Sequence, residues 1–454
     1  MPITTASKEA RKLFIEGREL AEYWQTEKAN GLFNKAIEID PEFALAYLFK
    51  AGTASDAKEY KEARAKAIAL SSKVSAGEQK LIAANQAVED ENNATKANEI
   101  YLELAAMFPK DKRVQLYLAS TYDGLQQYDK EIAALENAIA LDKNFAPAYE
   151  TLGYVHRWKN QFDKAEANFK EYLRLNPKLA NGHDNLADLY LRMGRFDEAM
   201  AQYQESFRID PSLRYSRLNI GITYAFMGNY DEGRKTLQAL MDGETKPAFK
   251  LYDQQLIART YMYEGDYAKA HEATDKALQM AQELGLPEQL AYNNEVKFVI
   301  FFAQNDWDKA EASIGEVARL VETADLTPAT KENYGVGISF WQTLVAAGRK
   351  DFAAAQAKVE ECAAKIAAIK NPAMQKYSNW LRGYIALAQG EAAKAVEYLG
   401  QGEVDDAFFM YNFAEAKEKT GDAAGAADLY KKVANWNLDG LWYPLVRAKA
   451  KAKI

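Results

Sequence analysis

Cysteine and histidine are scarce in this chain of 454 residues, which contains one cysteine and three histidines. The single cysteine, Cys362, excludes a disulfide framework within the chain and a thiolate metal cluster. The three histidines, His156, His183 and His271, lie too far apart in the sequence to form a local metal motif. We therefore predict neither a metal site nor a bound cofactor.

Long apolar runs and a dominant charge are also missing. No stretch approaches the roughly 18 apolar residues of a membrane span, and 57 basic against 65 acidic residues leave a net charge of −8. This balance gives no long-range attraction for phosphate backbones, so we expect no nucleic-acid binding and no membrane span. Residues 1–7 lack the basic start and apolar stretch of a signal peptide. The chain as written is expected to be cytoplasmic, or periplasmic or exported if a signal peptide was removed before Pro2.

Recognisable catalytic motifs are missing too. The glycines are dispersed, and no G-x-x-x-x-G-K phosphate-binding loop occurs. His183 and Asp184 are neighbours, but adjacent residues of a helix point in different directions, which favours a solvated surface over an acid–base pair. Cys362 lies beside carboxylates, which raise the pKa of a thiol and favour a buried structural role. We predict no catalytic residue and no enzymatic activity.

A repeating pattern is present, marked by two sets of turn-forming residues that share one period. The positions of four prolines differ by 68, 68 and 34, each a multiple of 34: Pro41, Pro109, Pro177 and Pro211. The positions of the turn residues Asn160, Gly194 and Gly228 again differ by 34. The two sets agree, which indicates an internal repeat, and repeats of this length are typical of stacked helical hairpins.

One period, residues 146–177, has the pattern of two helices joined by a short turn. Core-type residues recur at spacings of three and four on each predicted helix: Tyr149, Leu152, Gly153 and His156, then Phe162, Ala165, Phe169 and Tyr172. Residues 159–161 interrupt the pattern, and Pro177 ends it because proline disfavours helix at the residue before it. We expect the small Gly153 and Ala165 to lie where the two helices cross.

These landmarks resemble the tetratricopeptide repeat, a family of helical hairpins. Two copies carry the resemblance: Tyr149, Leu152-Gly153, Ala165, Phe169 and Pro177, then Leu186-Ala187, Tyr190, Ala199, Tyr203 and Pro211. Weaker copies on both sides bring the total to about twelve hairpins. The resemblance implies an all-α, right-handed α-solenoid, which we expect to end in a C-terminal capping helix. The order of features, from Thr4-Thr5-Ala6-Ser7 and Gly17-Arg18 to a last helix with Tyr443-Pro444, is similar to that of stand-alone bacterial tetratricopeptide-repeat proteins.

The repeat becomes less regular after Gly228, because the turns near Gly265, Asn305 and Gly348 follow at increasing spacings of 37, 40 and 43. Longer helices or loops would accommodate the excess. We expect five segments: an extended N-terminal segment at 1–7, a regular lobe at 8–240, a connecting loop at 241–248, an irregular lobe at 249–435 and the capping helix at 436–454.

The first helices of successive hairpins in this family line a concave groove. Projecting the repeat onto that face selects eight residues as a partner-binding groove: Glu150, Tyr154, Arg157, Asn181, Asp184, Asp188, Tyr215 and Asn219. As a set they combine rigid aromatic with hydrogen-bonding groups, the composition of a recognition surface. The alternative is that they are ordinary solvated polar residues. Glu150 and Asp184 stand where some relatives need cations to grip a C-terminal carboxylate, so that mode of binding is disfavoured.

The sequence therefore favours a non-enzymatic scaffold whose groove holds an extended or helical segment of a partner protein. The alternative is a structural solenoid that self-associates or joins a larger assembly through its convex faces.

Overall fold

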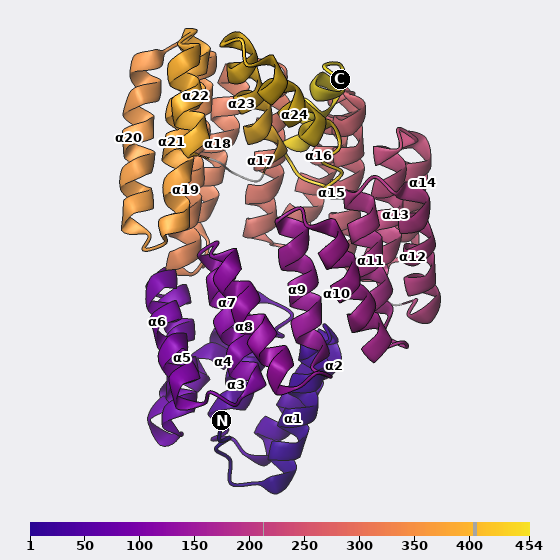
Figure 1. Cartoon of the computed structure of the whole chain (residues 1–454), viewed down its shortest axis with the longest axis vertical. Helices are drawn as coiled ribbons and strands as arrows, with labels where there is room; N and C mark the ends of the chain where they lie inside the picture. The colour runs from indigo at the N-terminus through magenta and orange to yellow at the C-terminus, as the bar shows by residue number, and fades with distance from the viewer. Residues whose placement is uncertain (212, 403–405) are drawn as a thin grey trace. The chain divides into compact units, whose positions relative to one another are not determined.

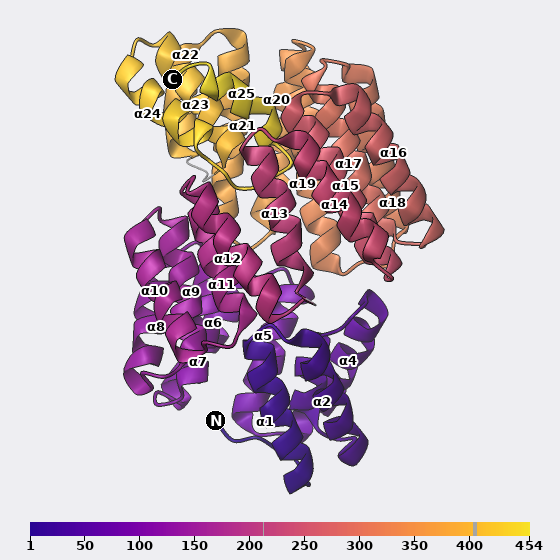
Figure 2. The same cartoon turned by 90° about the vertical axis from the view of Figure 1, so that its right-hand side faces the viewer.

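The computed structural model describes residues 1–211, 213–402 and 406–454. These residues form 25 α-helices and two short 3-10 helices, and no β-strand occurs among them. The predicted all-α fold class is confirmed. Consecutive helices pack in antiparallel pairs, which gives twelve hairpins in the described part of the chain, followed by one further helix (Figures 1 and 2). The chain divides into two compact units, residues 1–177 and 178–454.

Unit 1 (residues 1–177) contains five hairpins. Its first helices are α1 (Lys8–Glu22), α3 (Ala44–Ala51), α5 (Ala76–Glu89), α7 (Lys112–Gly124) and α9 (Ala146–Trp158). Their second helices are α2 (Thr26–Ile39), α4 (Ala57–Leu70), α6 (Ala94–Met107), α8 (Tyr128–Leu141) and α10 (Phe162–Leu175), with a 3-10 turn, η1 (Ser71–Lys73), after α4. Within this unit the hairpins stack as in an α-solenoid, each packing on the next in the chain.

Unit 2 (residues 178–454) contains seven hairpins and α25 (Tyr443–Lys451). Its first helices are α11 (Ala180–Arg192), α13 (Arg214–Phe226), α15 (Pro247–Glu264), α17 (Pro287–Ala303), α19 (Pro328–Gly348), α21 (Gln375–Gln389) and α23 (Ala407–Lys419). The second helices are α12 (Phe196–Ile209), α14 (Tyr230–Gly243), α16 (Tyr267–Glu283), α18 (Trp307–Thr323), α20 (Phe352–Ala368), α22 (Ala392–Gln401) and α24 (Ala423–Ala434). A 3-10 turn, η2 (Pro372–Met374), precedes α21.

The turn inside each hairpin explains the period seen in the sequence. Asn160, Gly194 and Gly228 have φ angles of 54°, 74° and 87°, and each follows the first helix of its hairpin. This left-handed conformation reverses the chain after a helix and favours glycine or asparagine, because other side chains clash with the backbone there. The turn residues recur at a fixed spacing because each hairpin repeats the same reversal.

The crossing point of the α9–α10 hairpin confirms the role predicted for Gly153 and Ala165. A Cβ atom on Gly153 would lie 2.4 Å from Cε1 of Phe169, far inside van der Waals contact. Ala165 is fully buried in the same hairpin. A larger side chain at Gly153 would therefore force the two helices apart.

The irregular repeats differ from the regular ones in helix length. Helices α7 to α14 have 13 or 14 residues each. Helices α15 to α20 have 17 to 21 residues each. The change falls where the sequence places a loop at 241–248, but α14 runs on to Gly243 and α15 begins at Pro247. The boundary between the two compact units lies instead between residues 177 and 178. Helix α14 packs directly on α15, so residues 241–248 do not separate two units.

The two ends of the chain are both held by side chains. Residues 1–7 precede α1 without helical structure, and Thr4 and Thr5 donate hydrogen bonds to Glu78 and Asp40. At the other end the predicted capping helix begins at Tyr443, not at residue 436, and residues 435–442 are irregular. Helix α25 packs on α24, α23 and α15.

Candidate functional site

The three predicted groove residues of unit 1, Glu150, Tyr154 and Arg157, all lie on α9. Glu150 is 5% exposed, and the indole Nε1 of Trp24 donates to its carboxylate, 3.2 Å from each oxygen. Arg157 is 8% exposed, with its guanidinium 4.8 Å from the ring centres of Tyr154 and Trp158. Glu150 and Arg157 are therefore both buried, with aromatic rings against their polar ends.

Three of the groove residues predicted in unit 2 take part in hydrogen bonds between helices. Ser216 on α13 donates to Asp184 at 2.7 Å, and Asn219 on α13 donates to Asp188 at 3.1 Å. Tyr203 on α12 donates to Asp188 at 2.5 Å. Burial, with the neighbouring Asp188 charge, raises the pKa of Asp184 to about 7. Asp184, Asp188 and Asn219 thus join α11 to α13, and Asn181 lies half-buried at the start of α11.

Tyr215, the remaining predicted residue, is 59% exposed near the start of α13. It lies thirteen positions before the turn residue Gly228. The same count back from the next two turns, Gly265 and Asn305, gives Tyr252 on α15 and Tyr292 on α17. Equal distance from the turn places the three tyrosines at the same level of successive first helices. We call Tyr215, Tyr252 and Tyr292 the tyrosine row.

The tyrosine row is open at one end and anchored at the other. Tyr252 is 39% exposed and Tyr292 is half-buried. The hydroxyl of Tyr292 accepts a hydrogen bond of 2.7 Å from Nη2 of Arg259, and Nη1 of Arg259 lies 2.6 Å from the carboxylate of Asp439. Burial raises the pKa of Tyr252, and the nearby Asp439 and Tyr215 raise it further. Burial also raises the pKa of Tyr292, so Tyr252 and Tyr292 present neutral phenols at physiological pH.

Sequence reasoning missed Tyr252 and Tyr292 because it projected a constant period. Helices α15 and α17 are longer than α13, so the spacing between repeats changes while the distance from tyrosine to turn does not. A count made from each turn residue, instead of from the previous repeat, finds both residues.

A carboxylate lies one helical turn beyond the tyrosine row. Glu295 follows Tyr292 by three residues on α17 and is half-buried. Burial raises the pKa of Glu295 to about 7. Tyr334, near the start of α19, is within electrostatic reach, since burial and then the Glu295 charge raise its pKa to about 12. No hydrogen bond or ion pair from any described residue reaches the Glu295 carboxylate.

The opposite ends of the same first helices are covered by the C-terminal segment (residues 435–451). The Arg192 guanidinium at the end of α11 lies 3.9 Å from the ring centre of Trp436 and donates to the carbonyl oxygen of Trp436. Asp439 accepts a hydrogen bond of 2.8 Å from Tyr263 near the end of α15, besides its contact with Arg259. These bonds place the irregular residues 436–442 across α11 and α15.

Helix α25 continues this cover with aromatic and charged contacts. Tyr443 is 2% exposed and packs edge-on against Phe226 of α13 and Tyr263 of α15, with ring centres 6.0 and 5.9 Å apart. Arg447 Nη2 donates to the Phe226 carbonyl oxygen at 2.5 Å. This bond satisfies a carbonyl that the end of α13 leaves without a helical partner. Trp442 packs against Phe298 of α17, so the cover extends over four first helices.

Models of known protein families match part of this chain. One family model for tetratricopeptide repeats matches residues 145–212 and a second matches residues 113–145. Residues 113–212 therefore match tetratricopeptide repeats. The matched residues extend from α7 to α12, where the repeat is most regular. Tetratricopeptide repeats are protein-interaction modules, so the matches indicate a protein-interaction scaffold.

Solved structures with tetratricopeptide-type folds are similar at low identity. Yeast Tom70 is 13% identical over 98% of this chain and 96% of its own, with a TM-score of 0.43. MamA is 23% identical over 36% of this chain and 91% of its own, with a TM-score of 0.31. TTC0263 of Thermus thermophilus is 22% identical over 47% of this chain and 98% of its own, with a TM-score of 0.31. The comparison with curated proteins finds no match.

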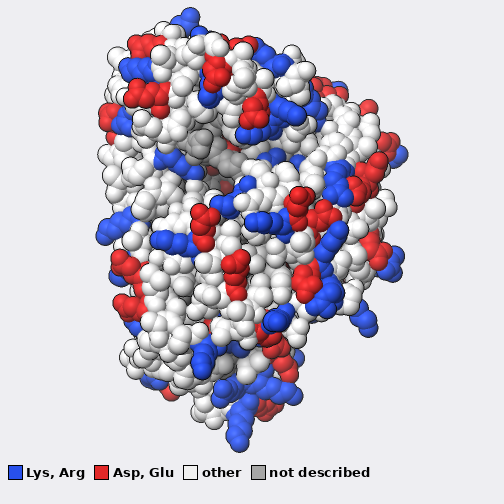
Figure 3. Space-filling view, viewed as in Figure 1, with Lys and Arg blue, Asp and Glu red and all other residues white. Residues whose placement is uncertain are grey.

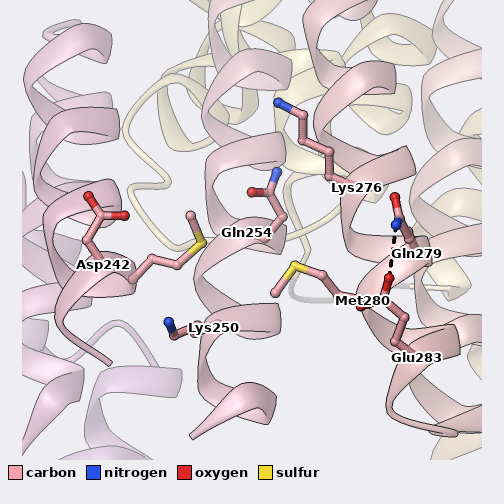
Figure 4. A pocket seen from close by; sticks show the side chains of 8 residues that line it. Asp242, Lys250, Gln254, Lys276, Gln279, Met280 and Glu283 are labelled. Atoms are coloured by element: carbon pink, nitrogen blue, oxygen red, sulfur yellow. Dashed lines mark hydrogen bonds between the residues drawn. The ribbon is translucent and has the colours of Figure 1, made fainter. Parts of the chain in front are cut away.

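A cleft of about 360 Å³ lies between α14, α15 and α16, where short repeats meet long ones. Figure 4 shows Gln254 and Met280 near its centre, with Asp242, Lys250 and Lys276 around them. The buried Gln254 donates to the Ala273 carbonyl oxygen at 3.0 Å, so its amide is already bonded. Charges of both signs surround the cleft, and no set of polar groups converges on one point within it.

The cysteine and the histidine–aspartate pair that the sequence analysis considered for catalysis are bonded or buried within the fold. Cys362 is fully buried, and burial raises the pKa of its thiol to about 11. His183 pairs with Gln202 at 2.8 Å while Asp184 bonds Ser216, so the two neighbours point to different partners. Among the described residues no group of three His, Cys, Asp or Glu side chains is placed to hold a metal ion.

The surface charge on the face drawn in Figure 3 is mixed in sign, and the described helices include no candidate membrane span. Figure 3 shows Lys and Arg interspersed with Asp and Glu over the face that it draws, with no area of a single sign. None of the helices in the described ranges has the length and apolarity needed to cross a bilayer.

Proposed function

We propose that this chain is a non-enzymatic scaffold that binds a segment of a partner protein on unit 2, across the starts of α13, α15 and α17. The observation that carries the proposal is the tyrosine row, in which Tyr215 and Tyr252 are 59% and 39% exposed at the same level of neighbouring first helices. The C-terminal segment covers the later ends of these helices, whereas Tyr215 and Tyr252 near the earlier ends are exposed.

Tyrosine suits such a surface for physical reasons. Its ring supplies a large apolar area with few rotatable bonds, and its hydroxyl bonds to a peptide backbone or a polar side chain. Stacked first helices repeat this combination along the face. An extended or helical segment that crosses α13, α15 and α17 would therefore contact one ring on each helix. The part that the eight originally predicted residues take in binding stays a prediction, and Tyr215 is the member of that set included here.

Selection from a random twelve-residue peptide library tests the proposal directly. Tyr215→Ala and Tyr252→Ala are combined in one variant, and exposed Leu141 on the second helix α8 gives the control variant Leu141→Ala. Exposed substitutions should each change the free energy of unfolding by less than about 0.5 kcal/mol. Loss of two aromatic anchors should weaken binding of selected peptides by at least about 30-fold, which corresponds to about 2 kcal/mol.

The outcomes separate the proposal from its alternative. Peptides that bind wild type and Leu141→Ala equally, but not the double tyrosine variant, support the scaffold. If the library yields no binder, or its binders ignore the tyrosine substitutions, the proposal fails. Sedimentation of the chain alone covers the structural alternative: dimers at micromolar concentration that the double variant loses would make the tyrosine row a self-association surface.

A further inference from the structure

The surroundings of Glu295 point to the chemistry of the segment that the tyrosine row would bind. Glu295 and Tyr292 are three residues apart on α17, a spacing that puts two side chains on one helical face. Tyr334 approaches from α19, the next first helix, where it packs against a hydrophobic cluster that contains Ala291 of α17. After burial, the Glu295 charge is among the causes that raise the pKa of both Tyr292 and Tyr334, so the carboxylate lies within electrostatic reach of the two phenols, and it remains partly open to solvent.

One cation on each of α15, α17 and α19 is already engaged with another group. On α15, Arg259 is bound to Asp439 and Tyr292. On α17, Lys297 lies 2.6 Å from Asp275 of α16, and on α19, Lys331 donates to the Glu322 carbonyl oxygen at 3.2 Å.

The other ionisable groups nearby add no positive charge. Glu288, two turns before Glu295 on α17, is exposed, and the Glu288 charge contributes to the raised pKa of Tyr334. Tyr334 and Tyr292 are neutral phenols. Glu295 is therefore a partly desolvated carboxylate for which the described residues supply no counter-ion.

Such a group favours a positively charged ligand for two reasons. A carboxylate that has lost part of its hydration gains more from a cation than a fully solvated one does, because the surrounding dielectric constant is lower. The negative faces of the tyrosine rings attract the same charge. On the basis of the proposed function, we propose that Glu295, with Tyr292 and Tyr334, holds a lysine or arginine side chain of the bound partner segment.

Proton binding at Glu295 makes this contact depend on pH. The neutral acid present well below pH 7 attracts no cation, whereas the carboxylate present well above pH 7 does. Binding of a basic side chain favours the charged form, so a proton is released as the complex forms near neutral pH. Affinity should therefore rise as pH increases from 6 to 8 and level off above that range.

The test uses Glu295→Gln, which keeps the shape of the side chain and removes its charge. The matched control is Glu272→Gln, an exposed glutamate on the second helix α16. The probes are peptides selected from the twelve-residue library on the wild-type chain, each made again with its lysines and arginines replaced by norleucine. Dissociation constants are measured at pH 6 and pH 8.

The expected result has three parts. Selected peptides should be enriched in lysine or arginine, and norleucine replacement should weaken their binding to wild type and Glu272→Gln by about tenfold at pH 8. That difference should shrink at pH 6. It should be absent at both pH values in Glu295→Gln, which still binds the peptides through the tyrosine row.

Two other results would overturn the inference and leave the proposed function intact. Peptides that require Tyr215 and Tyr252 but show no basic enrichment would exclude a cation site. Basic peptides whose preference survives in Glu295→Gln would place the cation elsewhere. If no peptide binds at all, the proposed function itself fails, which is a separate outcome.

Discussion

The two ends of the first helices in unit 2 differ sharply although they belong to one face. At the later ends, the C-terminal segment fills the surface with Trp436, Trp442 and Tyr443, of which Tyr443 is 2% exposed. At the earlier ends, Tyr215 is 59% exposed and contributes to no such cluster. The same residue type therefore stabilises the fold at one end and stays available at the other. Whether a tyrosine is buried or exposed therefore depends on which end of the first helices it lies at, not on its residue type.

The largest expected effect comes from the covered end. Tyr443→Ala removes a buried ring from between Phe226 and Tyr263 and should lower the free energy of unfolding by about 3–5 kcal/mol. Tyr215→Ala, the matched change at the open end, should cost less than about 0.5 kcal/mol. Urea unfolding followed by circular dichroism measures both. Similar losses of unfolding free energy in the two variants would show that the covered and open ends do not differ in their contribution to stability.

A medium effect is expected from Glu295 at the open end, as a pH dependence of stability. Its pKa is about 7 in the folded chain, against an ordinary value of 4.5 for a solvated glutamate. Between those values the unfolded chain has lost the proton and the folded chain keeps it, so stability falls as pH rises from about 4.5 to 7 and is constant above.

Removing the titrating group should remove that loss. At pH 8 Glu295→Gln should be more stable than wild type by about 1–2 kcal/mol, a figure reduced because the carboxyl is partly solvated. Below pH 4.5 the two chains should be equally stable. Thermal unfolding at several pH values measures the difference, with Glu272→Gln as the control. A parallel pH profile in wild type and Glu295→Gln would show that Glu295 is an ordinary surface carboxyl.

The smallest expected effect compares two glycines at equivalent turn positions of successive hairpins. Gly194→Ala and Gly228→Ala both place a side chain at positive φ, at a cost of about 1–2 kcal/mol each. A Cβ atom on Gly194 would also lie 3.2 Å from Nδ2 of Asn437 in the C-terminal segment, whereas nothing lies within 4 Å at Gly228. Gly194→Ala should therefore cost up to about 1 kcal/mol more. Equal melting temperatures would mean that the C-terminal segment moves aside freely.

Sequence reasoning succeeded where the determinants are local. Asn160, Gly194 and Gly228 revealed the hairpin period because a left-handed turn requires particular residues wherever it recurs. Gly153 revealed the crossing point because only a missing side chain leaves room for Phe169. These constraints act within one hairpin, so one repeat of sequence contains all the information needed to read them.

It failed where contacts join distant residues. Nothing near Glu150 in the sequence indicates that Trp24 covers its carboxylate from 126 residues away. Nor do the polar residues of 436–442 show that Asp439 pairs with Arg259, 180 residues earlier. The burial of Glu150 therefore depends on contacts between distant parts of the chain. The open tyrosine row, by contrast, was within reach of the sequence once the count began at each turn.

The C-terminal segment also has a consequence for the order in which the protein is made. Most contacts in a repeat array are between neighbours, so each hairpin can fold soon after it leaves the ribosome. Residues 435–451 are synthesised after every helix that they cover, and their bonds to Arg192, Phe226 and Arg259 span 244, 221 and 180 residues. Closing such long loops is slow and entropically costly. During synthesis, the later ends of α11, α13 and α15 therefore stay uncovered until these last residues arrive, and nascent unit 2 exposes Phe226 and Tyr263 to chaperones until then.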